Sequence, residues 1–112
     1  MRLWLTNPKW MCRKHLVSEH GECHAFVKMI ENGRKVEGYI KGGTLDPSKL
    51  IKRHNRLVKE MLERGYNHAT PLSTTVTLVQ GSIPKKTVRK LLISRCPECK
   101  QGYKLWKKNR KK

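Results

Sequence analysis

The chain has 112 residues, with 26 Lys and Arg against 8 Asp and Glu, and its formal net charge is +18. This length is typical of one domain with a modest core, and the charge excess exceeds what solubility requires, so it favours a polyanionic partner, nucleic acid before an anionic membrane surface. No segment approaches the roughly 20 apolar residues that span a bilayer, and "MRLWL" is too short for a signal-peptide core. We therefore expect a cytoplasmic location, with the four cysteines reduced or bound to metal.

The first predicted elements are a short leader and a long helix. Residues 3–6 are expected to be extended. Asn7-Pro8 is a good helix start, because Asn caps and Pro suits the first turn. The helix is expected to run to about Glu31, where Asn32-Gly33 is a clear stop. Residues 34–49 are expected to be irregular or weakly extended.

Two further helices are predicted. Asp46-Pro47 opens one that runs to about Arg64 and is closed by Gly65, and its apolar residues recur with helical spacing. Pro84 opens the other, and Pro97 is expected near its end. The sequence thus predicts an all-α fold, a compact single-domain three-helix arrangement over residues 1–106 with the leader folded against the first helix. Residues 107–112 are expected to be a basic mobile tail.

The first helix carries a stripe of chemically useful side chains. His15, Glu19, Glu22 and Phe26 are separated by four, three and four residues, so they share one helix face. Such a stripe is also common on a solvated helix surface, as an ordinary His–Glu pair. An acidic face on a chain of net charge +18 weakens binding to a polyanion, however, unless the carboxylates serve chemistry.

The leader is long enough to bring the chain terminus to this stripe. Pro8 and Glu22 are about 21 Å apart along a helix, and seven extended residues span up to about 24 Å. The α-amine of Met1 can therefore lie near Glu22. An α-amine has an ordinary pKa of about 7.7–8.0, so a fraction is neutral and nucleophilic at pH 7. An amine beside a carboxylate in a DNA-binding protein indicates imine chemistry at a sugar C1′.

Several motifs resemble one family. "KHLVSEHGEC", following "MRLWL", resembles the start of the phage endonuclease V, or pyrimidine-dimer DNA glycosylase, family, and "RHNRLVKEMLERGYNH" resembles its second helix. "GSIPKKTVRKLL" and "GYKLW" weakly resemble the third helix and the aromatic-basic tail. The resemblance implies an all-helical enzyme that flips a nucleotide out of the duplex. It also implies attack by the N-terminal α-amine on C1′, a Schiff base, and strand cleavage by β-elimination.

The resemblance assigns roles residue by residue. The family's assisting glutamate falls on Glu22, its helix-one histidine on His15, and its arginine next to the terminus on Arg2. The nucleophile falls on Met1, which is expected to be retained because Arg2 is bulky. Two DNA-clamping arginines of the family are replaced here by Gly21 and Ala25. These replacements bear on pyrimidine-dimer specificity more than on lyase chemistry.

The leading interpretation is a monomeric, nucleoid-associated, metal-independent DNA repair glycosylase with AP lyase activity on damaged double-stranded DNA, either pyrimidine-dimer or abasic. Met1, Glu22 and His15 are its candidate catalytic residues. The alternatives are a non-catalytic basic nucleic-acid-binding protein, zinc-stabilised or not, and a basic protein of an RNA–protein assembly. The candidate DNA-binding residues are Arg2, Arg13, Lys14, Lys28, Arg53, Lys86, Arg89, Lys90, Tyr103, Lys104 and Trp106.

The motif "CPEC" places Cys96 and Cys99 at the spacing of a zinc knuckle, although no cofactor is required by the leading interpretation. The alternative is a pair of reduced thiols at a helix end. Cys12 and Cys23 lie about 16 Å apart on one helix and cannot both complete one site. The candidate completing ligands are Cys12, Cys23, His20, His24 and His68.

Tyr103 and Trp106 fit either a stacking platform for bases or the core.

Overall fold

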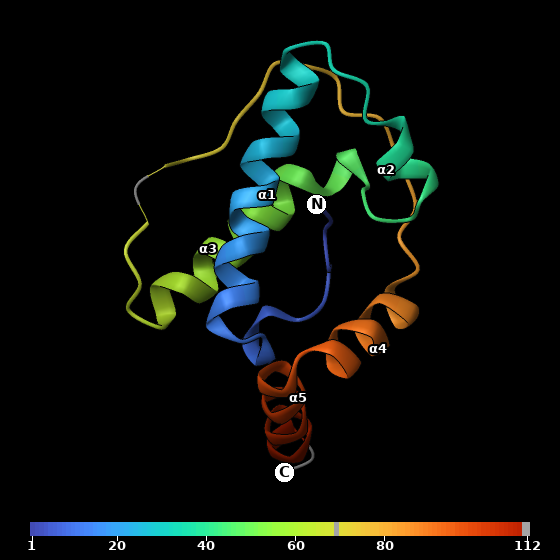
Figure 1. Cartoon of the computed structure of the whole chain (residues 1–112). Helices are drawn as coiled ribbons and strands as arrows, with labels where there is room; N and C mark the ends of the chain where they lie inside the picture. Colours follow the sequence, from blue (N-terminus) through green and yellow to red (C-terminus); the bar gives the residue numbers. More distant parts are fainter. Residues whose placement is uncertain (69, 111–112) are drawn as a thin grey trace.

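The computed structural model describes residues 1–68 and 70–110, and within these ranges it is all-α (Figure 1). Five α-helices and two short 3₁₀ helices follow one another in the chain. They are η1 (Pro8–Trp10), α1 (Arg13–Glu31), α2 (Glu37–Lys41), η2 (Pro47–Lys49), α3 (Leu50–Glu63), α4 (Lys85–Arg95) and α5 (Pro97–Arg110). The predicted fold class is confirmed, with two helices more than expected.

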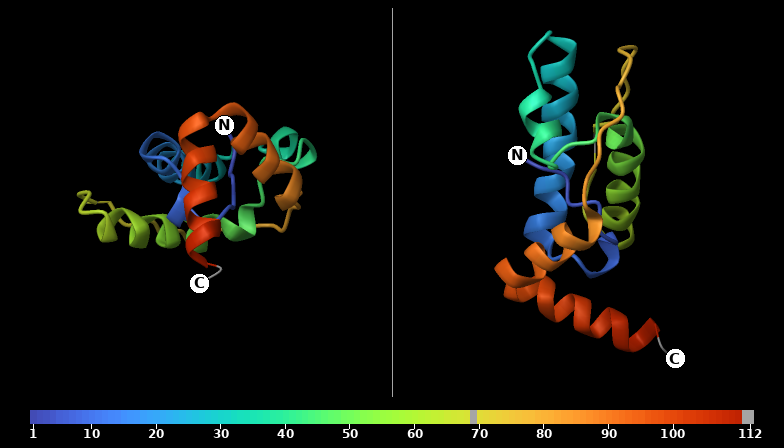
Figure 2. Two further views of the ribbon diagram at one scale, coloured as in Figure 1. Left: turned by 90° about the horizontal axis from the view of Figure 1, so that it is seen from below. Right: turned by 90° about the vertical axis from the view of Figure 1, so that its right-hand side faces the viewer.

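The core lies where α1 packs against α3, which is the most extensive contact between two elements. The two helices run side by side in opposite directions (Figure 2). Leu16 and Phe26 of α1 and Leu57 of α3 are fully buried there. Their spacing places them on the inward face of each helix, while most charged residues of α3 lie on its outer face, with the buried Arg53 as the exception. The leader packs against this pair of helices.

The leader folds back against α1, as predicted. Leu3 is fully buried, and its backbone N–H donates to the Thr44 carbonyl at 2.8 Å. Farther along, the Arg64 guanidinium donates to the carbonyls of Pro8 at 3.0 Å and of Met11 at 2.8 Å. These bonds tie Arg64, just after α3, to the backbone of η1 and of the residue that follows it. The leader is therefore held at both ends, and Met1 is brought to the side of α1.

The first predicted helix is divided in two. Asn7 does cap a helix, because its side chain accepts from the Lys9 N–H, but that helix is only the short η1. Met11 then has extended backbone, and Cys12 caps α1 through its sulfur. Asn32 ends α1, and Gly33 follows with φ of 75°, the left-handed conformation that a glycine stop supplies.

The segment after Cys96 differs most from the prediction. Pro97 does not lie inside the end of the third helix but occupies the first turn of α5, where its missing N–H costs no hydrogen bond. The helix continues to Arg110, so residues 107–110 of the expected tail are helical, and residues 111–112 lie outside the described ranges. In Figure 1, α5 projects below the α1–α3 pair.

The α5 helix approaches η1 closely. A Cβ atom at Gly102 would lie 2.3 Å from the Trp10 carbonyl oxygen, so only glycine fits at this crossing. Tyr103 packs edge-on against the Trp10 ring, with centroids 5.1 Å apart. The C-terminal helices are thus anchored on the segment that carries the leader into α1.

None of the helices in the described ranges is both long and apolar enough to cross a membrane.

Candidate active site

The predicted catalytic residues line one pocket of about 430 Å³ between the leader and α1. This volume lies in the range of small-ligand sites, roughly 300–1,000 Å³. The leader contributes Met1 and Arg2. Helix α1 contributes His15 from its first turn and Glu22 from its third turn. The full lining is Met1, Arg2, Trp4, Lys14, His15, Ser18, Glu22 and Thr44. The pocket thus brings together an α-amine, a carboxylate and three basic side chains.

Glu22 is half-buried at this pocket. Burial raises the pKa of Glu22, while the backbone N–H of Arg2 and the charge of the Met1 amine act in the opposite direction. Met1 and Glu22 line the same pocket, without a salt bridge between the amine and the carboxylate among the described residues. A carboxyl group with a raised pKa is better suited to exchange protons near neutral pH.

Arg2 is oriented within the same pocket. Its guanidinium stacks over the Trp4 ring, 4.7 Å from the centroid. Its Nε is buried without a hydrogen-bond partner among the described residues. Burial lowers the pKa of Arg2, helped by the charge of Arg95 and opposed by Glu22. A positioned guanidinium with unused hydrogen-bonding capacity suits a phosphate or sugar oxygen.

Glu19, the other acid of the helix stripe, does not line the pocket. It is fully buried and pairs with Arg53 of α3, whose Nε and Nη2 donate to its two oxygens at 2.7 and 2.9 Å. Arg53 Nη1 also donates to the Thr6 carbonyl at 2.7 Å. Because Arg53 is buried and its donors are used within the protein, we do not include it among the proposed DNA contacts.

The remaining candidate DNA-binding residues are spread over several elements. Arg13 and Lys14 are exposed at the start of α1, and Lys28 is exposed near its end. Arg13 stacks on Tyr66 at 4.7 Å from the ring centroid. On the C-terminal helices, the exposed candidates are Lys86, Lys90 and Lys104. Of these residues, only Lys14 is part of the pocket lining.

Tyr103 and Trp106 lie in a second hollow of about 220 Å³ beside the leader. Both rings are half-buried and pack on the core, and both are approached by cations: Arg89 and Lys107 at Tyr103, and Arg110 at Trp106. Each ring thus packs against the core and has basic groups over it, while the stacking of bases on these rings stays a prediction.

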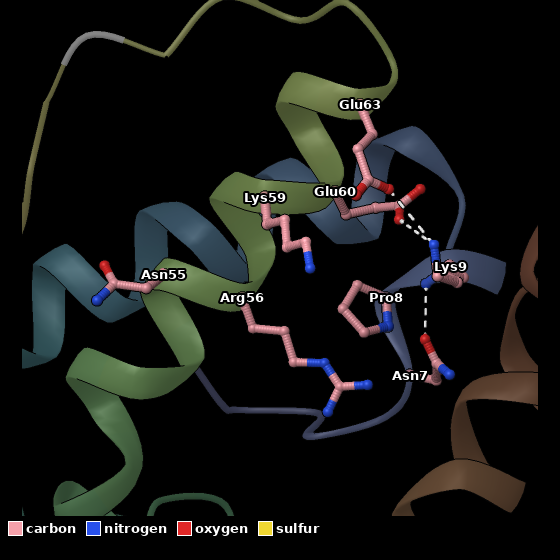
Figure 3. Close-up of a pocket in the computed structure, with 8 residues that line it drawn as sticks. All are labelled: Asn7, Pro8, Lys9, Asn55, Arg56, Lys59, Glu60 and Glu63. Atoms are coloured by element: carbon pink, nitrogen blue, oxygen red, sulfur yellow. Dashed lines mark hydrogen bonds and ion pairs between the residues drawn. The ribbon is translucent and has the colours of Figure 1, made fainter.

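Another hollow, of about 520 Å³, lies between η1 and α3 (Figure 3). Arg56 and Lys59 line it together with Glu60 and Glu63, and Lys9 pairs with Glu63 at 3.4 Å. No pattern in the sequence singles out Arg56 or Lys59. In the described part of the chain neither is in an ion pair, so both are free to meet a phosphate.

Cys96 and Cys99 are brought to the start of α1, where Cys12 and His15 complete a four-residue cluster able to hold a metal ion. The Cys12 sulfur lies 3.8 Å from that of Cys96 and 3.1 Å from His15 Nδ1, and Cys99 lies 3.7 Å from the same nitrogen. Tetrahedral zinc, with Zn–S of about 2.3 Å, places its ligands about 3.6–3.8 Å apart. The cluster is therefore close to zinc-binding geometry.

Of the predicted completing ligands, only Cys12 lies in this cluster. The fourth member is His15, which the sequence pattern assigns to the catalytic stripe of the first helix. Cys23 is buried in the core, and burial raises the pKa of its thiol to about 12, so it is an inert packing residue. His20, His24 and His68 lie elsewhere, where they gather with His54 in a second cluster.

The described residues form an all-α fold, the chain is strongly basic, and Met1 and Glu22 line one pocket. A family model described as pyrimidine dimer DNA glycosylase matches residues 1–74. The chain therefore belongs to the pyrimidine dimer DNA glycosylase family, a class of DNA repair enzymes whose substrate is DNA. The match includes the whole lining of the pocket and ends before α4. Searches of curated proteins and of solved structures gave no match.

Proposed function

We propose that this chain is a DNA glycosylase with AP lyase activity, in which the α-amine of Met1 is the nucleophile. The observation that carries the proposal is the pocket that Met1, with its α-amine, and the half-buried Glu22 line together. Family membership supports the substrate class, and the pocket supports the chemistry.

In the proposed reaction, the neutral amine attacks C1′ of the flipped nucleotide, and the damaged base leaves with its bonding electron pair and takes up a proton. Opening of the sugar ring yields an imine between Met1 and C1′. Removal of a C2′ proton then drives β-elimination, which breaks the bond between C3′ and its phosphate oxygen. Water hydrolyses the imine and frees the amine. Glu22 stabilises the cationic imine and moves protons.

Arg2 and Lys14 are proposed to hold the phosphates that flank the flipped nucleotide. Both line the pocket, and the Nε of Arg2 has no hydrogen-bond partner within the described chain. Basic groups at this position supply affinity that does not depend on sequence. Arg13, Lys28, Lys86, Arg89, Lys90, Tyr103, Lys104 and Trp106 extend the proposed contact to neighbouring DNA.

We also propose that Cys12, His15, Cys96 and Cys99 hold a structural zinc ion that ties α5 to the start of α1. All four positions of a tetrahedral site are then taken by protein, so the ion has no open position for substrate. With Nδ1 of His15 facing the thiolates, its other ring nitrogen carries the proton and donates a hydrogen bond. His15 is thus assigned to positioning a substrate oxygen and not to abstracting a proton.

Strand cleavage of a duplex with one abasic site tests the proposed chemistry. Glu22→Gln should reduce the cleavage rate by about 10²-fold or more, with DNA affinity unchanged or higher, because one negative charge is removed. A two-residue extension before Met1 should reduce it similarly, because the amine is displaced. Glu37→Gln, which removes an exposed acid from α2, is the matched control. Full activity of both altered proteins would favour the non-catalytic DNA-binding alternative.

The structural zinc has a separate test. Cys96→Ser should lower the zinc content of the untagged protein and loosen α5, with little change in the α1–α3 core. Amide hydrogen exchange reports the two regions separately. Exchange in α5 that is the same in Cys96→Ser and wild type would contradict a zinc tether.

A further inference from the structure

Four histidines from three separate segments meet on the side of the α1–α3 pair. His20 and His24 lie one turn apart on α1, His54 lies on α3, and His68 follows α3. His20 is within 4.8–4.9 Å of each of the other three rings, measured between centroids. One nitrogen from each ring lies within 4.8 Å of all the others. None of these residues lines the candidate active site.

The inward-facing nitrogens have no partner. The Nε2 atoms of all four histidines are buried, and none makes a hydrogen bond within the described chain. His54 is only 1% exposed, so water reaches its ring poorly. An unsatisfied buried polar group typically costs about 1–3 kcal/mol. Four such groups at one point indicate that something polar is held between them.

One of the four rings is oriented as a metal-binding histidine requires. His54 Nδ1 lies 2.9 Å from the side-chain oxygen of Asn55, which can only accept, so Nδ1 carries the proton. A ring that donates from Nδ1 presents its lone pair at Nε2. His54 is therefore held in the tautomer that coordinates a metal through Nε2.

We propose that His20, His24, His54 and His68 bind one late first-row divalent metal ion, with Zn²⁺ as the resident ion. Neutral imidazole suits this class of metal, and the absence of a carboxylate from the cluster disfavours Mg²⁺ and Ca²⁺. Zinc–nitrogen bonds of about 2.0–2.1 Å place tetrahedral ligands about 3.4 Å apart. Nitrogen separations of up to 4.8 Å need to shorten by about 1.4 Å at most to reach that spacing.

This site is structural because protein supplies all four ligands and leaves no position for substrate. It joins α1, α3 and the segment after α3, and it holds α1 on the side of the helix pair away from the leader's terminal amine. It is separate from the proposed cysteine–histidine site, which joins α1 to α5. Its occupancy is measured without any DNA substrate, so its failure and the failure of the proposed lyase reaction are distinguishable.

Metal analysis of untagged protein, purified with zinc present, tests the proposal. Wild type should contain two zinc ions per chain, one for each cluster, and Cys96→Ser/Cys99→Ser should retain one. Cobalt in that double variant should give visible d–d bands without the thiolate-to-cobalt charge-transfer band. Adding His68→Ala should remove the remaining ion, whereas adding Asn67→Ala, an exposed neighbour, should not.

The proposal would be overturned if the Cys96→Ser/Cys99→Ser protein took up neither zinc nor cobalt while circular dichroism showed that its helices were intact. If that variant does not fold, the zinc content of the single variant His68→Ala tests the proposal instead. A decrease from two zinc ions to one then supports the histidine site, and an unchanged zinc content contradicts it.

Discussion

At the scale of single residues, Glu19 and Arg53 are the two charged side chains that pair inside the core. Both side chains are almost completely removed from solvent, and their charges meet in a bidentate pair. Arg53 also fixes the leader through the Thr6 carbonyl, and the Leu5 N–H reaches Glu19 at 3.4 Å. Removing one partner of such a pair leaves a buried charge without compensation. The pair therefore couples the stability of the core to the position of the leader.

Arg53→Met is expected to lower the free energy of unfolding by about 3–5 kcal/mol, because Glu19 remains buried and unpaired. Denaturant unfolding at pH 7 measures the change. Arg56→Met, an exposed arginine on the same helix, is the matched control and should change stability by less than about 0.5 kcal/mol. Similar effects of the two substitutions would show that the buried pair has no special importance.

Gly21 lies exposed in the middle of α1, next to Glu22, and a Cβ atom there would meet nothing within 4 Å. Gly21→Ala should therefore raise the free energy of unfolding by about 0.5–1 kcal/mol, since glycine is a poor helix residue. Gly33→Ala is the contrasting control, because Gly33 has φ of 75° and alanine should be destabilising there. Thermal unfolding compares the two, and destabilisation by Gly21→Ala would contradict the open helix surface.

At the level of the helices, α5 crosses η1 closely at Gly102. Gly102→Ala brings a methyl group against the Trp10 carbonyl, so α5 must move away from η1. We expect faster amide exchange in α5 and a loss of about 1–3 kcal/mol. Gln101→Ala, its exposed neighbour, is the control. Unchanged exchange in α5 of Gly102→Ala would contradict the packing described here.

The helix boundaries were predictable where the sequence carries a local signal. Asp46-Pro47 and Pro84 precede helices, and Gly65, with φ of 83°, follows α3. Pro97 misled the prediction because proline both follows helices and opens them, and a local reading does not distinguish the two. The five-residue α2 was missed because its stability depends on packing, with Tyr39 resting edge-on against Phe26 of α1.

The sequence predicted the pocket better than it predicted the metal-binding clusters. The helical spacing of His15 and Glu22 and the length of the leader together predicted that Met1 lies in one region with them. Both quantities are distances along short segments of the chain, which the sequence alone supplies. The cysteine cluster joins residues 84 positions apart, and no local spacing reveals such a contact. His54 was missed for the same reason: its partners lie on another helix.

For the molecule as a whole, the net charge of +18 predicts strongly salt-dependent DNA binding. Each phosphate neutralised contributes about −0.9 to the slope of log K against log salt. Six to ten contacts would weaken binding by about 10³–10⁵-fold between 50 and 200 mM salt. Titration of an undamaged duplex by fluorescence anisotropy measures the slope. Affinity that is insensitive to salt would contradict a phosphate-based interface.

Lys14 offers a sharper version of the same test. Because it lines the pocket and is exposed, Lys14→Gln should reduce the salt slope by about 0.9, equivalent to the loss of one phosphate contact. Lys14→Arg should preserve it. A slope that is unchanged in Lys14→Gln would show that DNA does not reach the pocket.

The central claim is that the Met1 amine forms an imine with DNA, and borohydride trapping tests it most directly. Untagged protein is incubated with a duplex that carries one abasic site, reduced with borohydride, digested and mapped by mass spectrometry. The account predicts a reduced adduct on the α-amine of Met1, and none after the terminus is extended. Lys14, which also lines the pocket, is the internal comparison. An adduct on Lys14, or no adduct despite binding, would contradict the account.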